Sequence, residues 1–511
     1  MITPKTGRLY IIGAGFAGLT LAKEIKRKAI FGEVVAFLDD DPAKIGRRID
    51  GIPVLGPIRD VAQLLRMNPA DEAVIAIPGA AREYLIELYG ILKKAGFEKI
   101  RILPGISQII EGDAHLIQTR SIDPQDLLGR TPVAVNLKQS LAYLRGKRVL
   151  VTGAGGSIGS ELCRQLLSGG ASRLYLFGHG ENSIYQIDRE LHLLQEEGVG
   201  EKATLIPIIG DLKDANYIDY IIGKLKADVI FHAAAYKHVP MMEENPVAAI
   251  DNNFFGTINL ANAARKHAGQ GSAVKRFVLI TTDKAVEPVS VYGISKYLCE
   301  RVILEEAAKN NGNPVNFMVV RFGNVLGSRG SIMPLFQKQI EKGGPVTVTS
   351  AEMRRWFMTI PEACSLVLKA GGVGANGNLY LLDMGEPVKI KEMAEQMIRF
   401  YGFEPEKDIK IEYIGLRAGE RLDEQLWAGD ENPVKTEHGR ILRIERKSPY
   451  SLDLAELTEK LRPVCRFDAS RAEKYRDSDL LRKILKDAIP SLIMPADAKK
   501  APRREPAAVH G

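Results

Sequence analysis

Tyr292 and Lys296 have the types and the spacing of a proton-transfer pair. No proline separates them, so on a helix both side chains lie on one face. A lysine charge beside a phenol favours the phenolate and lowers the tyrosine pKa from its reference value of about 10. Such a base suits removal of a proton from an alcohol while hydride leaves to a nicotinamide. The motif alone is weak evidence, because a surface helix with an exposed tyrosine carries the same pattern.

A second polar group comes just before this pair. Residues 277–280 are apolar and are expected to form a buried parallel strand. The strand ends in a polar turn that carries Thr282, Asp283 and Lys284. In open α/β sheets the chemistry lies at such strand ends. This position favours a catalytic interpretation of the turn and of the tyrosine and lysine that follow.

A glycine fingerprint at residues 152–159 points to the cofactor. An apolar strand precedes it and a helix is expected at 160–168, so a pyrophosphate would lie on the helix N-terminus. His232 follows a later strand, and we interpret it as a structural strand-end residue beside small alanines. The residues expected to bind the dinucleotide, NAD or NADP, are Gly153, Gly156, Ser157, Ile158, Gly159, Asp211, Leu212, Ala233, Ala234, Tyr292 and Lys296.

The N-terminal part of the chain carries another fingerprint, with Gly13, Gly15 and Gly18 after a strand and Asp39 at the end of the next one. This spacing is typical of a dinucleotide-binding Rossmann unit. Either the site binds a second nucleotide, or the glycines are purely structural; the sequence leaves both possibilities open.

The order of elements predicts the architecture. At 511 residues the chain is too long for one ordinary core. Strands alternate with helices in both halves, which predicts an α/β fold with two Rossmann-like, doubly wound parallel sheets. Beyond residue 325 the pieces become shorter and predict a small substrate lobe. The expected parts are a nucleotide-binding domain at 1–122, a linker at 123–146, a catalytic domain at 147–494 with its lobe mainly at 325–494, and a disordered tail at 495–511.

Composition excludes several classes of protein. The longest uncharged apolar stretch, residues 9–22, is shorter than the roughly 20 residues that span a bilayer. No signal peptide is recognisable, and the four cysteines form no C-x-x-C pair, which indicates a reducing cytoplasm and no metal site. The net charge of +7 is modest and no basic run with interleaved aromatics indicates nucleic acid. We expect a homo-oligomer.

Eight motifs together resemble a family. They are TGAGGSIG at 152–159, HAAAYKHVP at 232–240, NxxGT at 253–257, TDKAV at 282–286, YGISK at 292–296, RFGNVLGSRG at 321–330, FMTIPEA at 357–363 and GLRAGERL at 415–422. This set resembles the UDP-N-acetylglucosamine 4,6-dehydratases, extended short-chain dehydrogenase/reductases of bacterial polysaccharide biosynthesis, over about residues 125–465. The N-terminal domain is similar to the one in long membrane-anchored members, whose transmembrane helices are not expected here.

The resemblance implies a role for each residue of the polar group. Tyr292 and Lys296 would handle the carbon 4 hydroxyl, Asp283 would protonate the departing carbon 6 hydroxyl, Lys284 would assist removal of the carbon 5 proton, and Thr282 would orient the sugar. Arginines at 329, 354, 355, 417 and 421 are numerous enough to hold a diphosphate. The substrate-binding residues expected are Asn324, Arg329, Arg355, Arg417 and Glu420.

Two departures and two alternatives accompany this interpretation. Some related dehydratases carry methionine at the position of Tyr292, which leaves retention or inversion at carbon 5 open. Relatives often show aspartate where this chain has Gly178, so we expect weak cofactor discrimination with NAD slightly preferred.

A UDP-sugar 4-epimerase shares the fold and the pair of Tyr292 and Lys296 but needs no acid such as Asp283. The other alternative is a non-catalytic dinucleotide-sensing or scaffold protein with two Rossmann domains. In that case the residues Thr282, Asp283 and Lys284 and the pair Tyr292 and Lys296 would occur together by chance.

Overall fold

The computed structural model describes residues 7–489, apart from 29–31, 78–79, 81, 98, 103–119, 122–140, 197, 201, 269–273, 310–311, 313 and 449. Most of the expected linker and the whole expected tail lie outside the described residues. The chain forms two compact units. The first comprises Met1–Ala134, Ile332–Val348 and Lys391–Tyr413, and the second comprises Val135–Ser331, Thr349–Ile390 and Ile414–Gly511.

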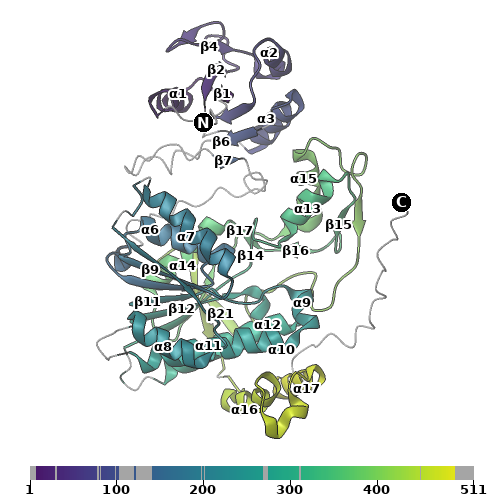
Figure 1. Ribbon diagram of the computed structural model, residues 1–511. Coiled ribbons are helices and arrows are strands. Elements are labelled where there is room, and N and C mark those ends of the chain that lie inside the picture. The colour runs from purple at the N-terminus through teal and green to yellow at the C-terminus, as the bar shows by residue number, and fades with distance from the viewer. Residues whose placement is uncertain are drawn as a thin grey trace. The chain divides into compact units, whose positions relative to one another are not determined.

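The first unit contains a seven-stranded sheet in the order β3-β4-β2-β1-β5-β6-β7 (Figure 1). Its central strand β1 pairs in parallel with β2 and β5. The apolar side chains of these strands are buried, and the Tyr10 hydroxyl donates a hydrogen bond to the carbonyl of Asn68 at 2.7 Å. The bounds are β1 Arg8–Ile12, β2 Glu33–Leu38, β3 Arg48–Ile49, β4 Ile52–Leu55, β5 Glu72–Ile75, β6 Lys99–Ile102, β7 Arg120–Ser121, α1 Phe16–Lys28, α2 Val61–Met67 and α3 Arg82–Ala95.

Later parts of the chain complete this unit. Strands β15 and β20 pair in parallel, and the ring of Phe400 in α15 stacks on Tyr89 of α3 with centroids 3.9 Å apart. The bounds are α13 Ile332–Glu341, β15 Val346–Val348, α15 Ile390–Phe400 and β20 Ile411–Tyr413.

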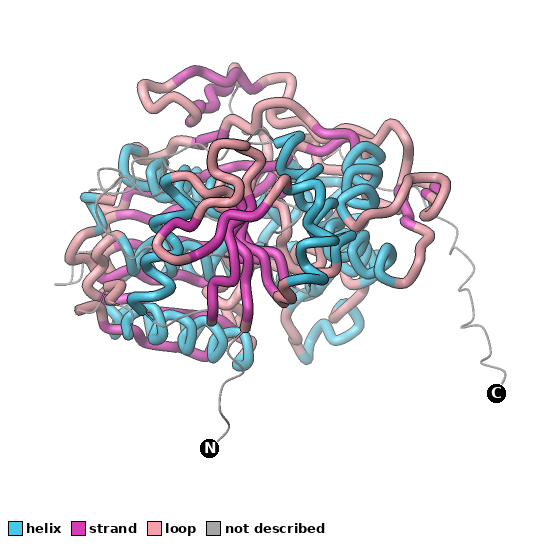
Figure 2. Tube along the Cα trace, turned by 90° about the horizontal axis from the view of Figure 1, so that it is seen from above, coloured by secondary structure: helices cyan, strands magenta, loops and turns pink. Residues whose placement is uncertain are grey.

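The second unit is built on a nine-stranded sheet in the order β10-β9-β8-β11-β12-β13-β18-β22-β21. The strands from β10 to β18 are parallel, and β22 is antiparallel to both of its neighbours. The twist of the strands is visible in Figure 2. The bounds are β8 Arg148–Thr152, β9 Arg173–Gly178, β10 Thr204–Ile209, β11 Val229–His232, β12 Arg276–Thr282, β13 Asn316–Phe322, β18 Leu379–Leu382, β21 Glu431–Lys435 and β22 Ile441–Arg446.

Helices cover both faces of this sheet, with α6, α7 and α14 on one side and α8, α11 and α12 on the other (Figure 1). Two short strand pairs, β14 with β17 and β16 with β19, lie beyond the sheet. The bounds are α6 Ser157–Ser168, α7 Glu181–Glu196, α8 Ala215–Leu225, α9 Val239–Glu244, α10 Pro246–Ala249, α11 Gly256–Lys266, α12 Val291–Ala308, α14 Ile360–Val373, α16 Leu454–Cys465, α17 Ser478–Ala488, β14 Asn324–Val325, β16 Arg354–Arg355, β17 Phe357–Met358 and β19 Val388–Lys389.

Helix α12 is the most deeply placed helix of the site. Most of its residues are buried, because it packs against β12, β13 and the π-helical turn Ile250–Phe255. The Ser290 hydroxyl caps its N-terminus by accepting the Gly293 N–H at 3.0 Å. The prediction of two parallel, doubly wound sheets is confirmed. Within the described ranges, no helix is long and apolar enough to cross a membrane.

Candidate active site

The turn after β12 holds a buried carboxylate. Asp283 has no exposed surface, and its Oδ1 accepts hydrogen bonds from Thr282 Oγ1 at 2.9 Å and from Lys284 Nζ at 3.0 Å. Its other oxygen, Oδ2, has no hydrogen-bond partner within the described part of the chain. A Cβ at Gly323 would come within 2.9 Å of this oxygen, so glycine keeps the space beside it open. The site therefore presents one unengaged acid oxygen.

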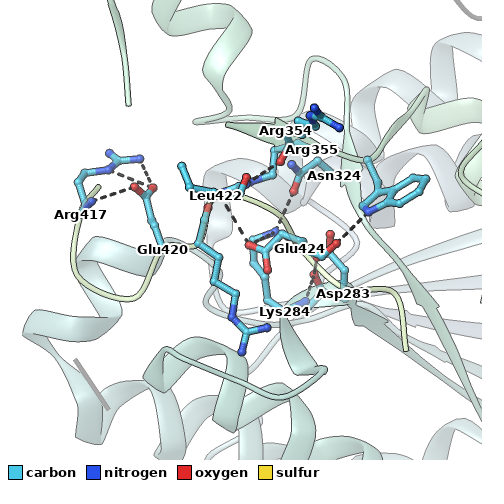
Figure 3. Close-up of polar contacts among 12 residues, drawn as sticks. Asp283, Lys284, Asn324, Arg354, Arg355, Arg417, Glu420, Leu422 and Glu424 are labelled. Atoms are coloured by element: carbon cyan, nitrogen blue, oxygen red, sulfur yellow. Dashed lines mark hydrogen bonds and ion pairs between the residues drawn. The ribbon is translucent and has the colours of Figure 1, made fainter. Parts of the chain in front are cut away.

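Lys284 lies between several acceptors. Its Nζ is 3.0 Å from Asn324 Oδ1 and 3.6 Å from Glu424 Oε1, in addition to the bond with Asp283 (Figure 3). Burial by itself lowers the pKa of Lys284, but the charges of Asp283 and Glu424 outweigh it and the pKa is raised. Lys284 is therefore an ammonium at neutral pH.

Tyr292 and Lys296 lie on α12, as expected. Burial and the Asp283 charge raise the pKa of Tyr292, against the smaller effect of a hydrogen bond with Thr282. Lys296 Nζ donates to the carbonyl of Ile280 at 2.8 Å, and burial lowers the pKa of Lys296. The direction expected from sequence for the pKa of the phenol is wrong, because burial and the charge of Asp283 are the largest influences on it and both raise it.

The loop between β8 and α6 fits a dinucleotide. Gly153 has φ +67°, and a Cβ at Gly159 would lie 2.1 Å from the Gly153 carbonyl oxygen, so both positions require glycine. Helix α6 begins at Ser157 with no side-chain cap from Gly156. Its first N–H groups can therefore receive a pyrophosphate.

The other expected cofactor residues follow β10 and β11 or lie in α6. Ala233 and Ala234 donate backbone hydrogen bonds to Thr152, and a Cβ on Gly153 would meet Ala234 at 2.8 Å. Asp211 follows β10, where its Oδ1 accepts the Lys213 N–H at 2.9 Å. Leu212 packs against Gly256, and Ile158 lies in the first turn of α6.

His232 is buried and has a partner on each ring nitrogen. Thr152 Oγ1 is 2.7 Å from Nδ1 and Thr257 Oγ1 is 2.9 Å from Nε2. Burial lowers the pKa of His232 to about 3, so the ring is neutral. These contacts support the structural interpretation.

Asn253 is a residue whose function the sequence reasoning did not identify. Its amide accepts the Tyr236 N–H at 2.8 Å, donates to the Tyr236 carbonyl at 2.9 Å and donates to Ser295 Oγ at 2.8 Å. It therefore links the segment after β11 to the catalytic helix. The available signal was its place in the NxxGT motif.

The expected substrate residues do not all lie together. Arg417 and Glu420 form a pair at 2.5 Å on the segment before β21 (Figure 3). Arg329 instead lies at the glycine loop, where its guanidinium donates to the Gly155 carbonyl and its N–H donates to Ser157 Oγ at 3.0 Å. Only Asn324 contacts the acid and lysine group directly.

Arg355 holds a loop together. It is buried, and its guanidinium donates to the carbonyls of Arg421 and Leu422, each at 2.8 Å. The neighbouring Trp356 donates its indole N–H to the carbonyl of Glu424 at 2.9 Å. The two residues fasten the segment that brings Glu424 to Lys284. Sequence reasoning missed Glu424, although it lies two residues after the end of the GLRAGERL motif.

The N-terminal fingerprint has Rossmann geometry. Gly13 has φ +103°, a Cβ at Gly18 would lie 2.0 Å from the Gly13 carbonyl oxygen, and Gly15 faces open space. Asp39 accepts the N–H groups of Ala14 at 2.8 Å and Asp41 at 2.9 Å. Burial raises the pKa of Asp39, but these bonds and Lys44 more than offset it and the pKa is lowered. Both carboxylate oxygens thus already have partners in the loop.

Comparison with known proteins places this geometry in context. The family model described as polysaccharide biosynthesis protein matches residues 149–446, more than half of the chain. The capsular polysaccharide biosynthesis protein CapD of Staphylococcus aureus is 41% identical over 435 residues, which are 85% of this chain and 70% of that protein. The UDP-glucose 4-epimerase of Rickettsia bellii is 30% identical over 306 residues, 58% of this chain and 82% of the epimerase. The X-ray structure of Pen from Bacillus thuringiensis has a TM-score of 0.52 and 31% identity, and the match covers 59% of this chain and 90% of Pen.

Proposed function

The chain belongs to the polysaccharide biosynthesis protein family, and we propose that it catalyses the 4,6-dehydration of a UDP-sugar, UDP-N-acetylglucosamine in the first instance. The broader assignment is an extended short-chain dehydrogenase/reductase that acts on a nucleotide sugar. The family match and the relative named as a UDP-glucose 4-epimerase support that broader assignment. The dehydration itself rests on the residues at the end of β12.

The observation that carries the proposal is the unengaged Oδ2 of Asp283. Because Oδ1 already accepts two hydrogen bonds, the transferable proton belongs on Oδ2. A protonated carboxyl here can donate to the carbon 6 oxygen of a sugar and let it leave as water. A 4-epimerase has no step that uses such an acid.

Tyr292 and Lys296 serve the first step. Tyr292 takes the proton of the carbon 4 hydroxyl in its phenolate form, so substrate and cofactor binding must offset the burial that raises its pKa. Lys296 is held on the same helix by the Ile280 carbonyl. A nicotinamide dinucleotide, NAD or NADP, supplies the hydride acceptor at carbon 4 and the hydride donor at carbon 6 when it is bound. Residues 153–159 together with Asp211, Leu212, Ala233 and Ala234 would hold it.

Oxidation at carbon 4 acidifies the proton on carbon 5, which allows water to be eliminated. Thr282 orients the sugar, Asp283 delivers its proton to the carbon 6 oxygen, and Lys284 assists removal of the carbon 5 proton. The UDP group would be held by Asn324, Arg417 and Glu420, with Arg329 between the glycine loop and the diphosphate. Arg355 contributes by holding the loop rather than by touching UDP.

The test is incubation of the protein with UDP-N-acetylglucosamine, followed by mass spectrometry of the sugar nucleotide. A product lighter by one water supports dehydration. A product of unchanged mass with inverted carbon 4 supports the second candidate, a UDP-sugar 4-epimerase, which the relative from Rickettsia bellii favours.

For the N-terminal domain we propose an ancillary role. Its residues Gly13, Gly15, Gly18 and Asp39 would bind a nucleotide or nucleotide sugar for regulation or assembly. Asp39, after β2, already accepts hydrogen bonds from the Ala14 and Asp41 N–H groups and from Lys44 Nζ at 3.1 Å, which occupies both of its oxygens, and we therefore assign this domain no chemistry.

A further inference from the structure

Glu424 is a buried carboxylate to which the proposed reaction assigns no role. The residue is 9% exposed, on the segment between β20 and β21. The indole N–H of Trp356 holds its backbone carbonyl, and Arg355 holds the carbonyls of the residues two and three positions before it. A loop fastened at three carbonyls fixes where this carboxylate lies.

Glu424 faces Lys284. Its Oε1 is 3.6 Å from Lys284 Nζ and 3.9 Å from Arg355 Nη2 (Figure 3). Asp283 Oδ1 and Asn324 Oδ1 are the other acceptors, each 3.0 Å from the same Nζ. The charged groups around the ammonium are therefore Asp283, Glu424 and Arg355.

This arrangement poses a chemical problem for the carbon 5 step. An ammonium has no lone pair, so Lys284 can accept the carbon 5 proton only as it gives up one of its own. Asp283 is the charged partner of Lys284 in the structure, but the proposed reaction needs it protonated before carbon 6 loses its hydroxyl, so Asp283 cannot also receive the carbon 5 proton. The amide oxygen of Asn324 is not basic. Among the described residues, Glu424 is the remaining acceptor beside Nζ.

We propose that Glu424 is the proton acceptor through which Lys284 removes the carbon 5 proton. The inference rests on the proposed dehydration. The carbon 5 C–H bond breaks and its proton forms an N–H bond at Lys284 Nζ, while a different Nζ proton passes to Glu424 Oε1. The electron pair left at carbon 5 forms the double bond to carbon 6 as the hydroxyl departs with the Asp283 proton.

The same path returns the proton. Once hydride has reached carbon 6, Lys284 gives a proton to carbon 5 and recovers one from Glu424, so that the lysine ends protonated and the glutamate ionised. Glu424 holds one of the Nζ protons between the two events, and in deuterated water the proton returned to carbon 5 can therefore be a deuteron. Glu424 thus acts through Lys284 and need not touch the sugar.

The experiment compares wild type, Glu424→Gln and Glu424→Asp in deuterated water with UDP-N-acetylglucosamine. Absorbance of the reduced cofactor reports oxidation at carbon 4, and mass spectrometry reports deuterium at carbon 5 and loss of water. We expect Glu424→Gln to reduce its cofactor normally but to exchange at carbon 5 and form product on the order of 100-fold more slowly. Glu424→Asp should recover part of the rate. Exposed Asp423 on the same loop provides the control Asp423→Asn, with wild-type behaviour.

The pH profile separates this role from a merely structural one. Loss of the Glu424 charge lowers the pKa of Lys284, so the residual rate of Glu424→Gln should rise with pH as the free amine of Lys284 appears. A flat profile, normal carbon 5 exchange, or loss of cofactor reduction in Glu424→Gln would overturn the role of Glu424 while dehydration by the wild type stands. A wild type that forms no dehydrated product overturns the proposed function itself, and this step with it.

Discussion

Arg321 and Glu300 form a buried, two-pronged ion pair, with Nε 3.1 Å from Oε1 and Nη2 2.8 Å from Oε2. The pair joins β13, which leads to Asn324, with α12, which carries Tyr292. Glu431 of β21 adds a second carboxylate 2.7 Å from Arg321 Nη1. The arginine therefore fastens three elements around the site from within the core.

Removal of one member of this pair should destabilise the protein strongly. Glu300→Gln removes the negative charge that pairs with the buried guanidinium of Arg321. We expect the free energy of unfolding to fall by roughly 3–5 kcal/mol, because a buried charge without its partner is costly. Denaturant unfolding measures it. In the exposed pair of Lys460 and Glu456, water screens both charges, and Glu456→Gln should lower the free energy of unfolding far less. An equal loss of unfolding free energy in the two variants would show that burial does not make the Arg321–Glu300 pair more important for stability than an exposed pair.

Asp283→Asn should separate oxidation from dehydration. The asparagine keeps the size of the side chain but carries no transferable proton, so water loss should slow by roughly 100- to 10,000-fold. Oxidation at carbon 4 precedes this step, and absorbance of the reduced cofactor should still appear with substrate. Tyr292→Phe should abolish that absorbance. Product formed by Asp283→Asn at the wild-type rate would refute the assignment of the acid.

The bound cofactor should be a mixture weighted toward NAD. Gly178 offers no carboxylate to a ribose hydroxyl, and its neighbours His179 and Gly180 bring no Arg or Lys to pair with a 2′-phosphate. Mass spectrometry of the nucleotide released by denaturing the protein identifies it. Pure NADP would contradict this expectation.

Two glycine substitutions should distinguish the fingerprints. A Cβ at Gly15 meets nothing within 4 Å, so aspartate fits there. A Cβ at Gly156 would lie 3.1 Å from the Gly153 carbonyl oxygen, a tight contact that requires a small backbone shift, so circular dichroism should first show that Gly156→Asp is folded. Gly156→Asp repels a pyrophosphate and should abolish cofactor retention and turnover. Gly15→Asp should leave turnover of UDP-N-acetylglucosamine intact, because the N-terminal site does no chemistry. Loss of turnover in Gly15→Asp would end the ancillary assignment.

His232 should make stability depend on pH. Burial lowers its pKa from 6.5 to about 3, so between these values the unfolded chain binds a proton that the folded chain does not, and stability falls as pH falls. At about 1.4 kcal/mol per pH unit, wild type should lose about 2 kcal/mol more than His232→Asn between about pH 6.5 and about pH 5. Unfolding curves at both pH values measure the difference, and parallel losses would contradict a neutral buried ring.

Those features of the fold and the site that depend on local motifs or on periodic patterns could be predicted from the sequence. The alternation of strands and helices predicted both sheets, and the motifs predicted the family; both predictions are confirmed. The acid and lysine at the end of β12 and the tyrosine on α12 lie on the elements expected for them. These features follow from neighbours in the chain, which is why a single sequence contains them.

What the sequence could not supply depends on segments far apart. Glu424 reaches Lys284 only because Arg355 and Trp356, about 70 residues earlier, bind backbone carbonyls of its loop, a contact with no periodic pattern. The pKa of Tyr292 is raised and not lowered because of burial and the Asp283 charge, neither of which the spacing of Tyr292 and Lys296 reveals. Arg329 likewise contacts Gly155 and Ser157, which lie more than 170 residues earlier in the chain, and no local pattern predicts this contact.

The loop that ends at Glu424 is fastened by its carbonyl groups, which every amino acid possesses. The exposed side chains of Leu422 and Asp423 can therefore be exchanged without loosening the carboxylate beside Lys284. Substitutions at these two positions should therefore leave Glu424 at the same place beside Lys284.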